Sequence, residues 1–401
     1  MNASVGSAPT PLKVSCLLVN YFSTETLGRA LHSVLAQQLA NASLRIALDV
    51  VVVDNSVDAQ EARQLQEKMA VLQTPSNISV QLILNPTNTG FGEGNNLAFA
   101  KCQGDMVMLL NPDARMSAHC ILSLAEALHQ HDALGACCPQ QFWDDAHAWQ
   151  LPPAWLPSGI GTWTLTKAHH DARTALRLSN AYRNLALQSW LSSNQTSTQT
   201  SPPVVQRALS GGAMMVRRSA IAGPLFDPAY FMYFEDSDLS LRLAQQGWTL
   251  AMVPDAHLVH EWTHSAGKVA MMEASKAHYF ERHFNGRGQW QQRLAALTAQ
   301  SKGALDNPLG ASEVALTGEA WSGKVPQAWA DAWLLEASPS PLLTPSVGQL
   351  GSGQTATVSK ALLSRMSFAP EGSKQRTAVY VRLGPAKATR ETLPVFKLDL
   401  N

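Results

Sequence analysis

The sequence predicts an α/β fold in which a mostly parallel sheet is flanked by helices and followed by a small β-rich domain. Three observations predict it. A strand, helix, strand unit opens the chain, an unbroken apolar run at 106–110 suits a strand buried on both faces, and alternating apolar and polar residues replace helical patterns after residue 299. We therefore expect domains at 1–302 and 303–401, the second of unknown role.

The opening unit consists of a buried strand at 14–19, a crossover helix at 27–39 and a second strand at 50–53. Polar residues stand where each strand ends, with Asn20 after the first and Asp54 after the second. A right-handed parallel connection brings such residues to one edge of the sheet, where ligands bind in open α/β folds. Asp54 could equally be a cap for the helix that follows.

A third buried strand is predicted at 106–110, and the sequence Asn111-Pro112-Asp113 follows at once. Before it, Gly90, Gly92 and Gly94 allow a tight backbone, and a helix beginning near Gly94 would point free N–H groups toward a phosphate. The glycine spacing does not match the dinucleotide-binding fingerprint, so an ordinary turn is the simpler interpretation of the glycines alone.

The segment 229–260 places adjacent carboxylates, Glu235 and Asp236, after a run of aromatic residues and at the start of a predicted helix. The helix terminus favours an ionised carboxylate while an apolar shell raises its pKa, so Asp236 could act as a base near neutral pH. Helix capping is the alternative role. Asp238 and Arg242, four residues apart, are expected to pair on the helix surface.

Seven segments in this order resemble the inverting glycosyltransferases of family 2, which have the GT-A fold. The rhamnosyltransferase-like and galactofuranosyltransferase-like members are the most similar. The resemblance covers about residues 12–285. It is carried by VNYFSTE, VVVDNS, NTGFGEGNN, LLNPDA, LSGGAMMVRR, FMYFEDSDLSLRL and VPDAHLVH.

The resemblance implies a role for each matching position. Asp54 would bind the nucleotide base, Asp236 would be the catalytic base with Glu235 beside it, and Asp113 with His260 would face a metal ion and the donor diphosphate. The other residues implied to line the nucleotide site are Asn20, Tyr21, Asn55, Asn88, Gly90, Phe91, Asn95, Asn96 and Asn111.

The metal motif of the family has the form Asp-X-Asp, with two acidic positions. This sequence has Asn111-Pro112-Asp113, in which only the second of these positions is acidic. One carboxylate binds a divalent cation less tightly than two, although an amide oxygen can also be a ligand. We expect Mg²⁺ or Mn²⁺ to stabilise the charge that develops on the departing nucleoside diphosphate. Asp236 would take the proton of the attacking acceptor hydroxyl, and this single displacement inverts the sugar.

Composition excludes some classes of protein. Thirty basic and thirty acidic residues cancel, which argues against a nucleic-acid binder. Five cysteines without a metal-ligand pattern favour a reducing cytoplasm. The sequence contains no signal segment and no apolar run long enough to span a bilayer, so we expect membrane contact to be peripheral, at the inner face.

The expected partners are a nucleotide-sugar donor and a glycan or lipid-linked acceptor in bacterial surface polysaccharide synthesis, with dTDP- or UDP-activated rhamnose or galactofuranose as the sugar. The tryptophan-rich region 150–205 could touch acceptor or lipid, or pack as an ordinary core. Two other functions stay open: a glycoside hydrolase using Asp113 and Asp236 as its carboxylate pair, and a sugar-nucleotide-binding protein without turnover.

Overall fold

A computed structural model describes residues 10–193, 201–263, 266–285, 289–300, 303–369 and 375–400. The chain divides into two compact units, each made of two segments. Unit 1 comprises Met1–Gln140 and Thr198–Leu258, and unit 2 comprises Gln141–Ser197 and Val259–Asn401.

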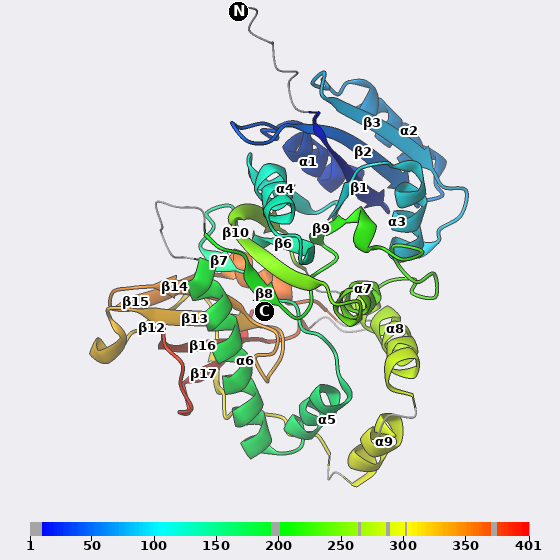
Figure 1. Cartoon of the computed structure of the whole chain (residues 1–401). Helices are drawn as coiled ribbons and strands as arrows, with labels where there is room; N and C mark the ends of the chain where they lie inside the picture. Colours follow the sequence, from blue (N-terminus) through cyan, green and yellow to red (C-terminus); the bar gives the residue numbers. More distant parts are fainter. Residues whose placement is uncertain are drawn as a thin grey trace, which may run out of the picture. The chain divides into compact units, whose positions relative to one another are not determined.

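Unit 1 is the α/β part of the chain (Figure 1). Its elements are β1 (Leu12–Asn20), α1 (Thr24–Leu35), β2 (Ile46–Asp54), α2 (Ala59–Ala70), β3 (Ile78–Leu84), α3 (Gly90–Lys101), β4 (Met106–Leu110), β5 (Ala114–Met116), α4 (Cys120–Gln130), β6 (Leu134–Phe142), β8 (Val204–Gln206), β9 (Ala213–Arg217), η1 (Arg218–Ala220), α7 (Glu235–Gln245) and β10 (Thr249–His260). The last residues of β6 and β10 belong to unit 2.

The strands of unit 1 form a sheet in the order β6-β9-β4-β1-β2-β3. The four strands β3, β2, β1 and β4 are parallel, whereas β9 runs antiparallel to β4. The expected mostly parallel α/β sheet is therefore confirmed. Asn20 is in register with Asp54, so both lie at the carboxyl edge of the sheet, as expected.

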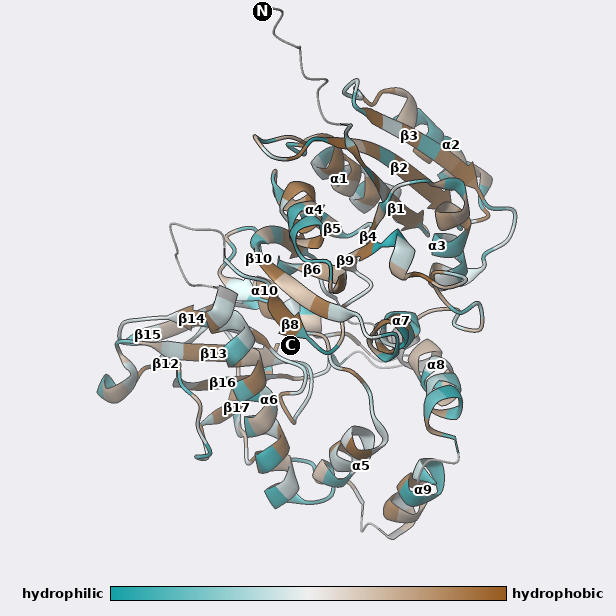
Figure 2. Cartoon of the chain, viewed as in Figure 1, coloured by the Kyte–Doolittle hydropathy of each residue, from teal (hydrophilic) through white to brown (hydrophobic). Residues whose placement is uncertain are grey.

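Successive residues of the central strands point to opposite faces of the sheet and pack in two separate hydrophobic cores. Cys16 and Leu18 pack in the cluster that includes α1 and α4, while Leu17 packs in the cluster that includes α3 and α7. A strand buried on both faces carries apolar residues at every position. This explains the unbroken apolar runs, which Figure 2 shows as brown strands.

Helix α3 begins four residues earlier than expected, at Gly90, so the three glycines lie inside its first turns. Gly90 adopts a φ of 82°, and an added Cβ would lie only 2.1 Å from the Phe231 carbonyl oxygen. Glycine is needed there because no side chain fits between the helix start and the loop before α7. The sequence suggested a loop because glycine disfavours helix interiors.

Unit 2 contains a mainly antiparallel sheet and a group of helices (Figure 1). Its elements are β7 (Trp149–Gln150), α5 (Gly159–Ala168), α6 (Ala172–Ser193), α8 (Ala266–Phe284), α9 (Trp290–Gln300), β11 (Ser312–Ala315), β12 (Ala320–Lys324), η2 (Gln327–Trp329), β13 (Trp333–Ser338), β14 (Val347–Gly351), β15 (Thr355–Ser359), α10 (Lys360–Leu363), η3 (Ser364–Met366), β16 (Val379–Pro385) and β17 (Val395–Asp399). The sheet order is β11-β17-β16-β13-β14-β7, with β12 and β15 paired apart from it.

Residues 303–401 are rich in strands, as expected, but they share unit 2 with residues 141–197 and 259–300. Strand β14 pairs with β7, and Arg183 of α6 lies 3.2 Å from the Glu336 carboxylate of β13. These contacts join segments far apart in the sequence, which explains why the unit is larger than the expected 303–401. Whether residues 303–401 fold as a separate domain stays a prediction.

The tryptophans of region 150–205 have different environments. Trp190 is buried and donates a hydrogen bond from Nε1 to the Leu151 carbonyl oxygen (2.9 Å), which is ordinary core packing. Trp155, in contrast, is exposed. The polar sequence SSNQTSTQTSPP at 192–203, for which the sequence predicts a loop, lies partly outside the described residues.

Candidate active site

A network of hydrogen bonds fixes Asp54 at the carboxyl edge of the unit 1 sheet. Its Oδ1 accepts bonds from Asn20 Nδ2 (3.0 Å), Ser56 N (3.1 Å) and Ser56 Oγ (2.7 Å). Asn20 is fully buried and also donates to Glu61 Oε1 (3.3 Å). The amide of Asn20 is therefore used to orient Asp54, which leaves the other carboxylate oxygen of Asp54 for a ligand.

Exposed aromatic side chains follow β1 beside this network. Tyr21 and Phe22 are 52% and 57% exposed and meet edge to face, with ring centroids 5.0 Å apart. Phe22 has a φ of 48°, and Val57 on the neighbouring loop is also exposed with a φ of 54°. Phe22 is therefore held exposed in a backbone conformation that is rare for a bulky residue, and exposed aromatic rings of this kind are candidates for a binding surface. Sequence reasoning missed Phe22, although two adjacent aromatics after a buried strand are a signal for it.

The asparagines after β2 and within α3 hold the loop between them. Asn55 donates to the Gly90 carbonyl oxygen (2.7 Å), Asn88 accepts from Gly90 N (3.0 Å) and Asn96 donates to the Phe226 carbonyl oxygen (2.8 Å). Asn95 donates to the Phe91 carbonyl oxygen within the helix (2.9 Å). The side chains of Asn55, Asn88, Asn95 and Asn96, all predicted to line the nucleotide site, therefore form hydrogen bonds that stabilise the local backbone.

The start of α3 is less open to a phosphate than expected. Gly90 N donates to Asn88 Oδ1, and Phe91 N donates to the Phe231 carbonyl oxygen at 2.8 Å. A helix start binds anions through free N–H groups, and two of those groups are already used here.

The loop before β9 links the start of α7 to Asn111 at the end of β4. Asp236 Oδ2 accepts a hydrogen bond from Gly211 N (2.9 Å), and Asn111 N donates to the Gly212 carbonyl oxygen (2.8 Å). A Cβ added at Gly211 would lie 3.3 Å from the Asp236 Cβ, so the loop approaches α7 closely. The loop thus brings Asp236 to the ends of β4 and β9, which the sequence order alone did not reveal.

Glu235 is 5% exposed, and its Oε2 is buried without a hydrogen-bond partner among the described residues. Burial, and next the negative charge of Asp236, raise the pKa of Glu235 well above its ordinary value. Burial also raises the pKa of Asp236, while hydrogen bonds from Gly211 and Ser237 counteract part of this rise. The pair therefore holds protons more tightly than ordinary carboxylates.

The backbone before these carboxylates is strained. Tyr233 and Phe234 have φ values of 71° and 67°, and Phe234 occupies the cap position of α7. Left-handed conformations cost bulky residues energy and cluster at functional sites. Burial, followed by the charges of Glu235 and Asp113, raises the pKa of Tyr233 to about 12. Asp113 therefore lies close enough to this turn to act on it electrostatically.

One expectation about α7 is wrong. Asp238 and Arg242 pair at 2.7 Å, but Asp238 is fully buried and only Arg242 reaches the surface. Arg242 also donates to the Leu225 carbonyl oxygen (2.7 Å). The pair anchors α7 to the preceding loop, and Arg242 offsets the cost of burying the ionised carboxylate of Asp238.

The oxygen atoms present at the end of β4 suit a hard cation. Asn111 Oδ1 is buried and accepts no hydrogen bond from the described residues, and the Asp113 carboxylate follows two positions later. Oxygen ligands of this kind are what Mg²⁺ prefers, with substrate phosphates completing its shell. Within the described part of the chain, no group of three or more His, Cys, Asp or Glu side chains could hold a metal by itself.

His260 lies at the end of β10, in unit 2, and its Nδ1 is 3.3 Å from Gln141 Oε1. Its expected role as a metal ligand stays a prediction.

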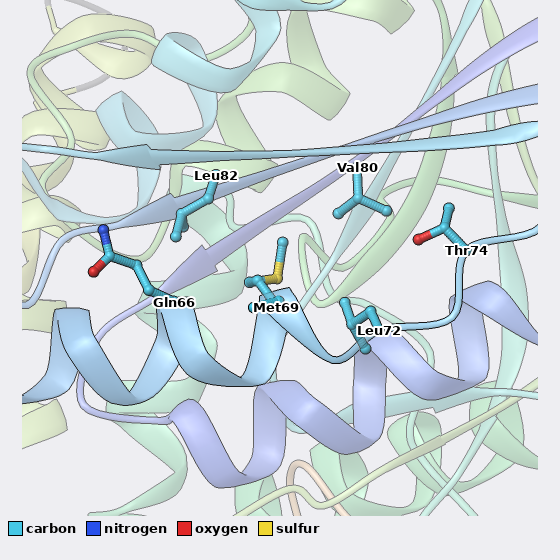
Figure 3. A pocket seen from close by; sticks show the side chains of 7 residues that line it. Gln66, Met69, Leu72, Thr74, Val80 and Leu82 are labelled. Carbon is cyan, nitrogen blue, oxygen red and sulfur yellow. The ribbon is translucent and has the colours of Figure 1, made fainter.

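A pocket of about 470 Å³ lies elsewhere in unit 1, between α2 and the sheet-edge strand β3. Figure 3 shows Val80 and Leu82 of β3 pointing toward Met69 and Leu72. The residues that line the pocket include no titratable group, so they supply no acid or base for catalysis.

The family of the chain follows from comparison with known sequences. The sequence model of glycosyl transferase family 2 matches residues 15–221, which is just over half of the chain. The chain belongs to this family of glycosyltransferases. The matched residues include the ends of β1, β2 and β4 and the Gly211 loop.

Relatives with assigned names agree with this class. The chain is 29% identical over 240 residues to the N-acetylglucosaminyl-diphospho-decaprenol L-rhamnosyltransferase of two Mycobacterium tuberculosis strains. The match covers 57% of this chain and 72% of the relative. An uncharacterised glycosyltransferase of a Nostoc species is 31% identical over 124 residues, or 31% of this chain and 35% of that protein.

Solved structures resemble the chain more distantly. GalNAc-T7 with UDP, GalNAc and Mn²⁺ has a TM-score of 0.43 at 15% identity, covering 73% of this chain and 55% of that one. TarS of S. aureus with UDP gives 0.41 at 14% identity, covering 72% and 71%. A Pyrobaculum calidifontis mannosyltransferase with GDP-Man and Mn²⁺ gives 0.41 at 13%, covering 74% and 77%.

Among the described residues, none of the helices is both long and apolar enough to cross a membrane.

Proposed function

We propose that the protein is an inverting glycosyltransferase that moves a sugar from a nucleoside diphosphate donor to a lipid-linked saccharide acceptor. The observation that carries the proposal is the 29% identity with a rhamnosyltransferase named for a lipid-diphosphate acceptor, over 72% of that relative. A rhamnose-like sugar on dTDP or UDP is the donor that we propose to test first, with a galactofuranose donor second. Bacterial surface polysaccharide synthesis, at the inner face of the membrane, is the proposed setting.

In this proposal the donor base lies at the edge of the unit 1 sheet. The free carboxylate oxygen of Asp54 accepts a hydrogen bond from the base, and the exposed Tyr21 and Phe22 rings offer surfaces for stacking. The network through Asn20 and Ser56 keeps Asp54 from rotating. A carboxylate oxygen can only accept a hydrogen bond, so Asp54 favours a base that presents an N–H group to it, as uracil and thymine can.

Asp236 is the proposed general base. The acceptor hydroxyl attacks the anomeric carbon from the face opposite the diphosphate, the sugar–oxygen bond to the diphosphate breaks, and the hydroxyl proton passes to the Asp236 carboxylate. The Gly211 N–H holds that carboxylate in place. Inversion of the anomeric centre follows from the single displacement.

Asp113 and the Asn111 amide oxygen are the proposed protein ligands for Mg²⁺ or Mn²⁺. When bound, the cation supplies positive charge to the leaving nucleoside diphosphate.

The test measures nucleoside diphosphate release from a panel of dTDP- and UDP-sugars with Mg²⁺ or Mn²⁺. The acceptor in this assay is an N-acetylglucosaminyl diphosphate that carries a short, water-soluble tail. Release that requires both donor and acceptor supports the proposal. Donor binding without release would indicate a non-catalytic sensor, and sugar release from a glycan without nucleotide sugar would indicate a hydrolase; either result contradicts it.

A further inference from the structure

Helix α5 of unit 2 and the residues just before it carry large apolar side chains that are exposed in the described part of the chain. Ile160 is 65% exposed, Trp155 just before the helix is 46% exposed, and Leu165 is also exposed. Exposed aliphatic residues are normal when scattered, but here they gather within eleven residues. Helix α5 has the sequence GIGTWTLTKA, whose one charged residue is Lys167 in the last turn, and Figure 2 shows where the helix lies in the chain.

Basic residues border these apolar side chains. Lys167 holds its ammonium 5.3 Å from the centre of the half-buried Trp163 ring, and Ile160, Trp163 and Lys167 follow the spacing of one helix face. Helix α9 packs against α5, with the Trp290 ring resting on Gly159. The guanidinium of Arg293 lies over that ring, 5.3 Å from its centre.

The local charge differs from that of the whole chain. Residues 152–178 contain Lys167, Arg173 and Arg177 against a single acid, Asp171, and residues 289–299 contain Arg293 and no acid. A hydrogen bond from the Thr174 side chain, one from the Arg173 backbone and then the charge of Lys167 lower the pKa of Asp171, so the positive charge of Lys167 is partly balanced. Within the described ranges, no carboxylate forms an ion pair with Arg173, Arg177 or Arg293.

From these contacts we infer that unit 2 binds an anionic lipid bilayer through a basic aromatic surface, defined as Trp155, Ile160, Trp163, Lys167, Arg173 and Arg293. Tryptophan and lysine are the residues that lie at the boundary between headgroups and acyl chains, where indole is amphipathic and ammonium meets lipid phosphate. Exposed aliphatic side chains add apolar area, and unpaired cations add attraction to anionic lipid. The inference rests on the proposed function, since a lipid-linked acceptor is presented at such a bilayer.

The test is sedimentation of the full chain with phosphatidylcholine vesicles, with and without phosphatidylglycerol. The wild type should pellet with the anionic vesicles and much less with the neutral ones, and salt should weaken this binding. Arg173→Ser/Arg293→Ser should weaken it by about 10-fold or more, since each cation near an anionic surface contributes on the order of 1 kcal/mol. Ile160→Asp should weaken binding by a similar factor, roughly 10-fold, through loss of apolar burial and added repulsion.

Matched controls separate this surface from general changes. Val71 in unit 1 is 79% exposed, so Val71→Asp makes the same change elsewhere and should bind vesicles like the wild type. Arg63→Ser/Lys101→Ser removes two exposed cations of unit 1 and should also leave binding unchanged. The inference would be overturned if the surface variants bound vesicles as well as the wild type does. It would also be overturned if the wild type bound no vesicles, which is the result expected if this surface binds a protein instead.

The inference and the proposed function fail separately. Nucleoside diphosphate release on the water-soluble acceptor should be unchanged in Ile160→Asp, whereas release on an acceptor embedded in anionic vesicles should fall. Turnover of the soluble acceptor without any vesicle binding would overturn the inference and leave the function standing. Vesicle binding without turnover of any donor would contradict the function alone.

Discussion

Glu235 in unit 1 and Glu336 in unit 2 are both buried carboxylates, and their surroundings are opposite. Glu336 accepts hydrogen bonds from Arg382 Nε (2.7 Å), Arg382 Nη2 (2.8 Å) and Ser346 Oγ (3.1 Å). Glu235 instead has a buried oxygen without a partner in the described structure and a raised pKa. A buried carboxylate that stabilises a fold is usually paired, whereas one without a partner and with a raised pKa is a candidate for a role in catalysis.

The largest effect is expected from Glu336→Gln, which leaves Arg183 and Arg382 buried without their carboxylate. Breaking such a pair costs about 3 to 5 kcal/mol of folding free energy, because the remaining charges are not solvated. Chemical denaturation of unit 2 would measure this loss. The control is Glu313→Gln, since Glu313 is 78% exposed and bonds Lys397 at the surface; it should cost under about 1 kcal/mol. Equal, small losses would show that the paired cluster is not structural.

The proposed cation should produce the next largest effect. Asp113→Ala should lower turnover roughly 10- to 100-fold at limiting Mg²⁺ or Mn²⁺, with partial recovery at high metal. If His260 also faces the cation, Asp113→Ala and His260→Ala together should cost less than the sum of the two single losses. Independent, additive losses would remove His260 from the site. Full wild-type activity in excess chelator would contradict the metal proposal itself.

Glu235→Gln should give a smaller effect, of opposite sign for stability. Because the folded-state pKa of Glu235 is raised, the wild type loses stability as pH rises from the ordinary glutamate value through that raised pKa. The neutral variant lacks this loss, so at pH 8 its free energy of unfolding should exceed that of the wild type by on the order of 1 kcal/mol. Thermal unfolding at pH 8 would show this as a higher midpoint temperature. The difference should vanish in acid. A variant less stable than the wild type at pH 8 would show that Glu235 is compensated in solution.

The sheet of unit 1 was predictable because its signals are local. Apolar runs such as 106–110 predict strands that are buried on both faces, and polar residues such as Asp54 indicate where those strands end. The start of α3 was not predictable, since Gly90 is selected by the approach of Phe231, which lies far away in the sequence. The burial of Asp238 depends in the same way on packing that helical spacing does not encode.

The candidate site was predictable as a set of positions more than as a set of contacts. In the sequence, Asp113 follows a predicted strand and Asp236 stands at the start of a predicted helix. Only the structure shows that the Gly211 loop hydrogen-bonds both Asp236 and Asn111, the residue at the end of β4. The Arg183–Glu336–Arg382 cluster was missed entirely, because its members are separated by many residues and look like surface charges in the sequence.

The most direct test compares nucleoside diphosphate release by the wild type and by Asp236→Asn, at saturating donor, metal and acceptor. If Asp236 is the general base, Asp236→Asn should keep its thermal stability and donor binding but lose at least ~100-fold in turnover, the low end of general-base effects. Glu235→Gln should lose less. Near wild-type turnover by Asp236→Asn would contradict the role of Asp236 as general base, and a larger loss in Glu235→Gln would assign that role to Glu235 instead.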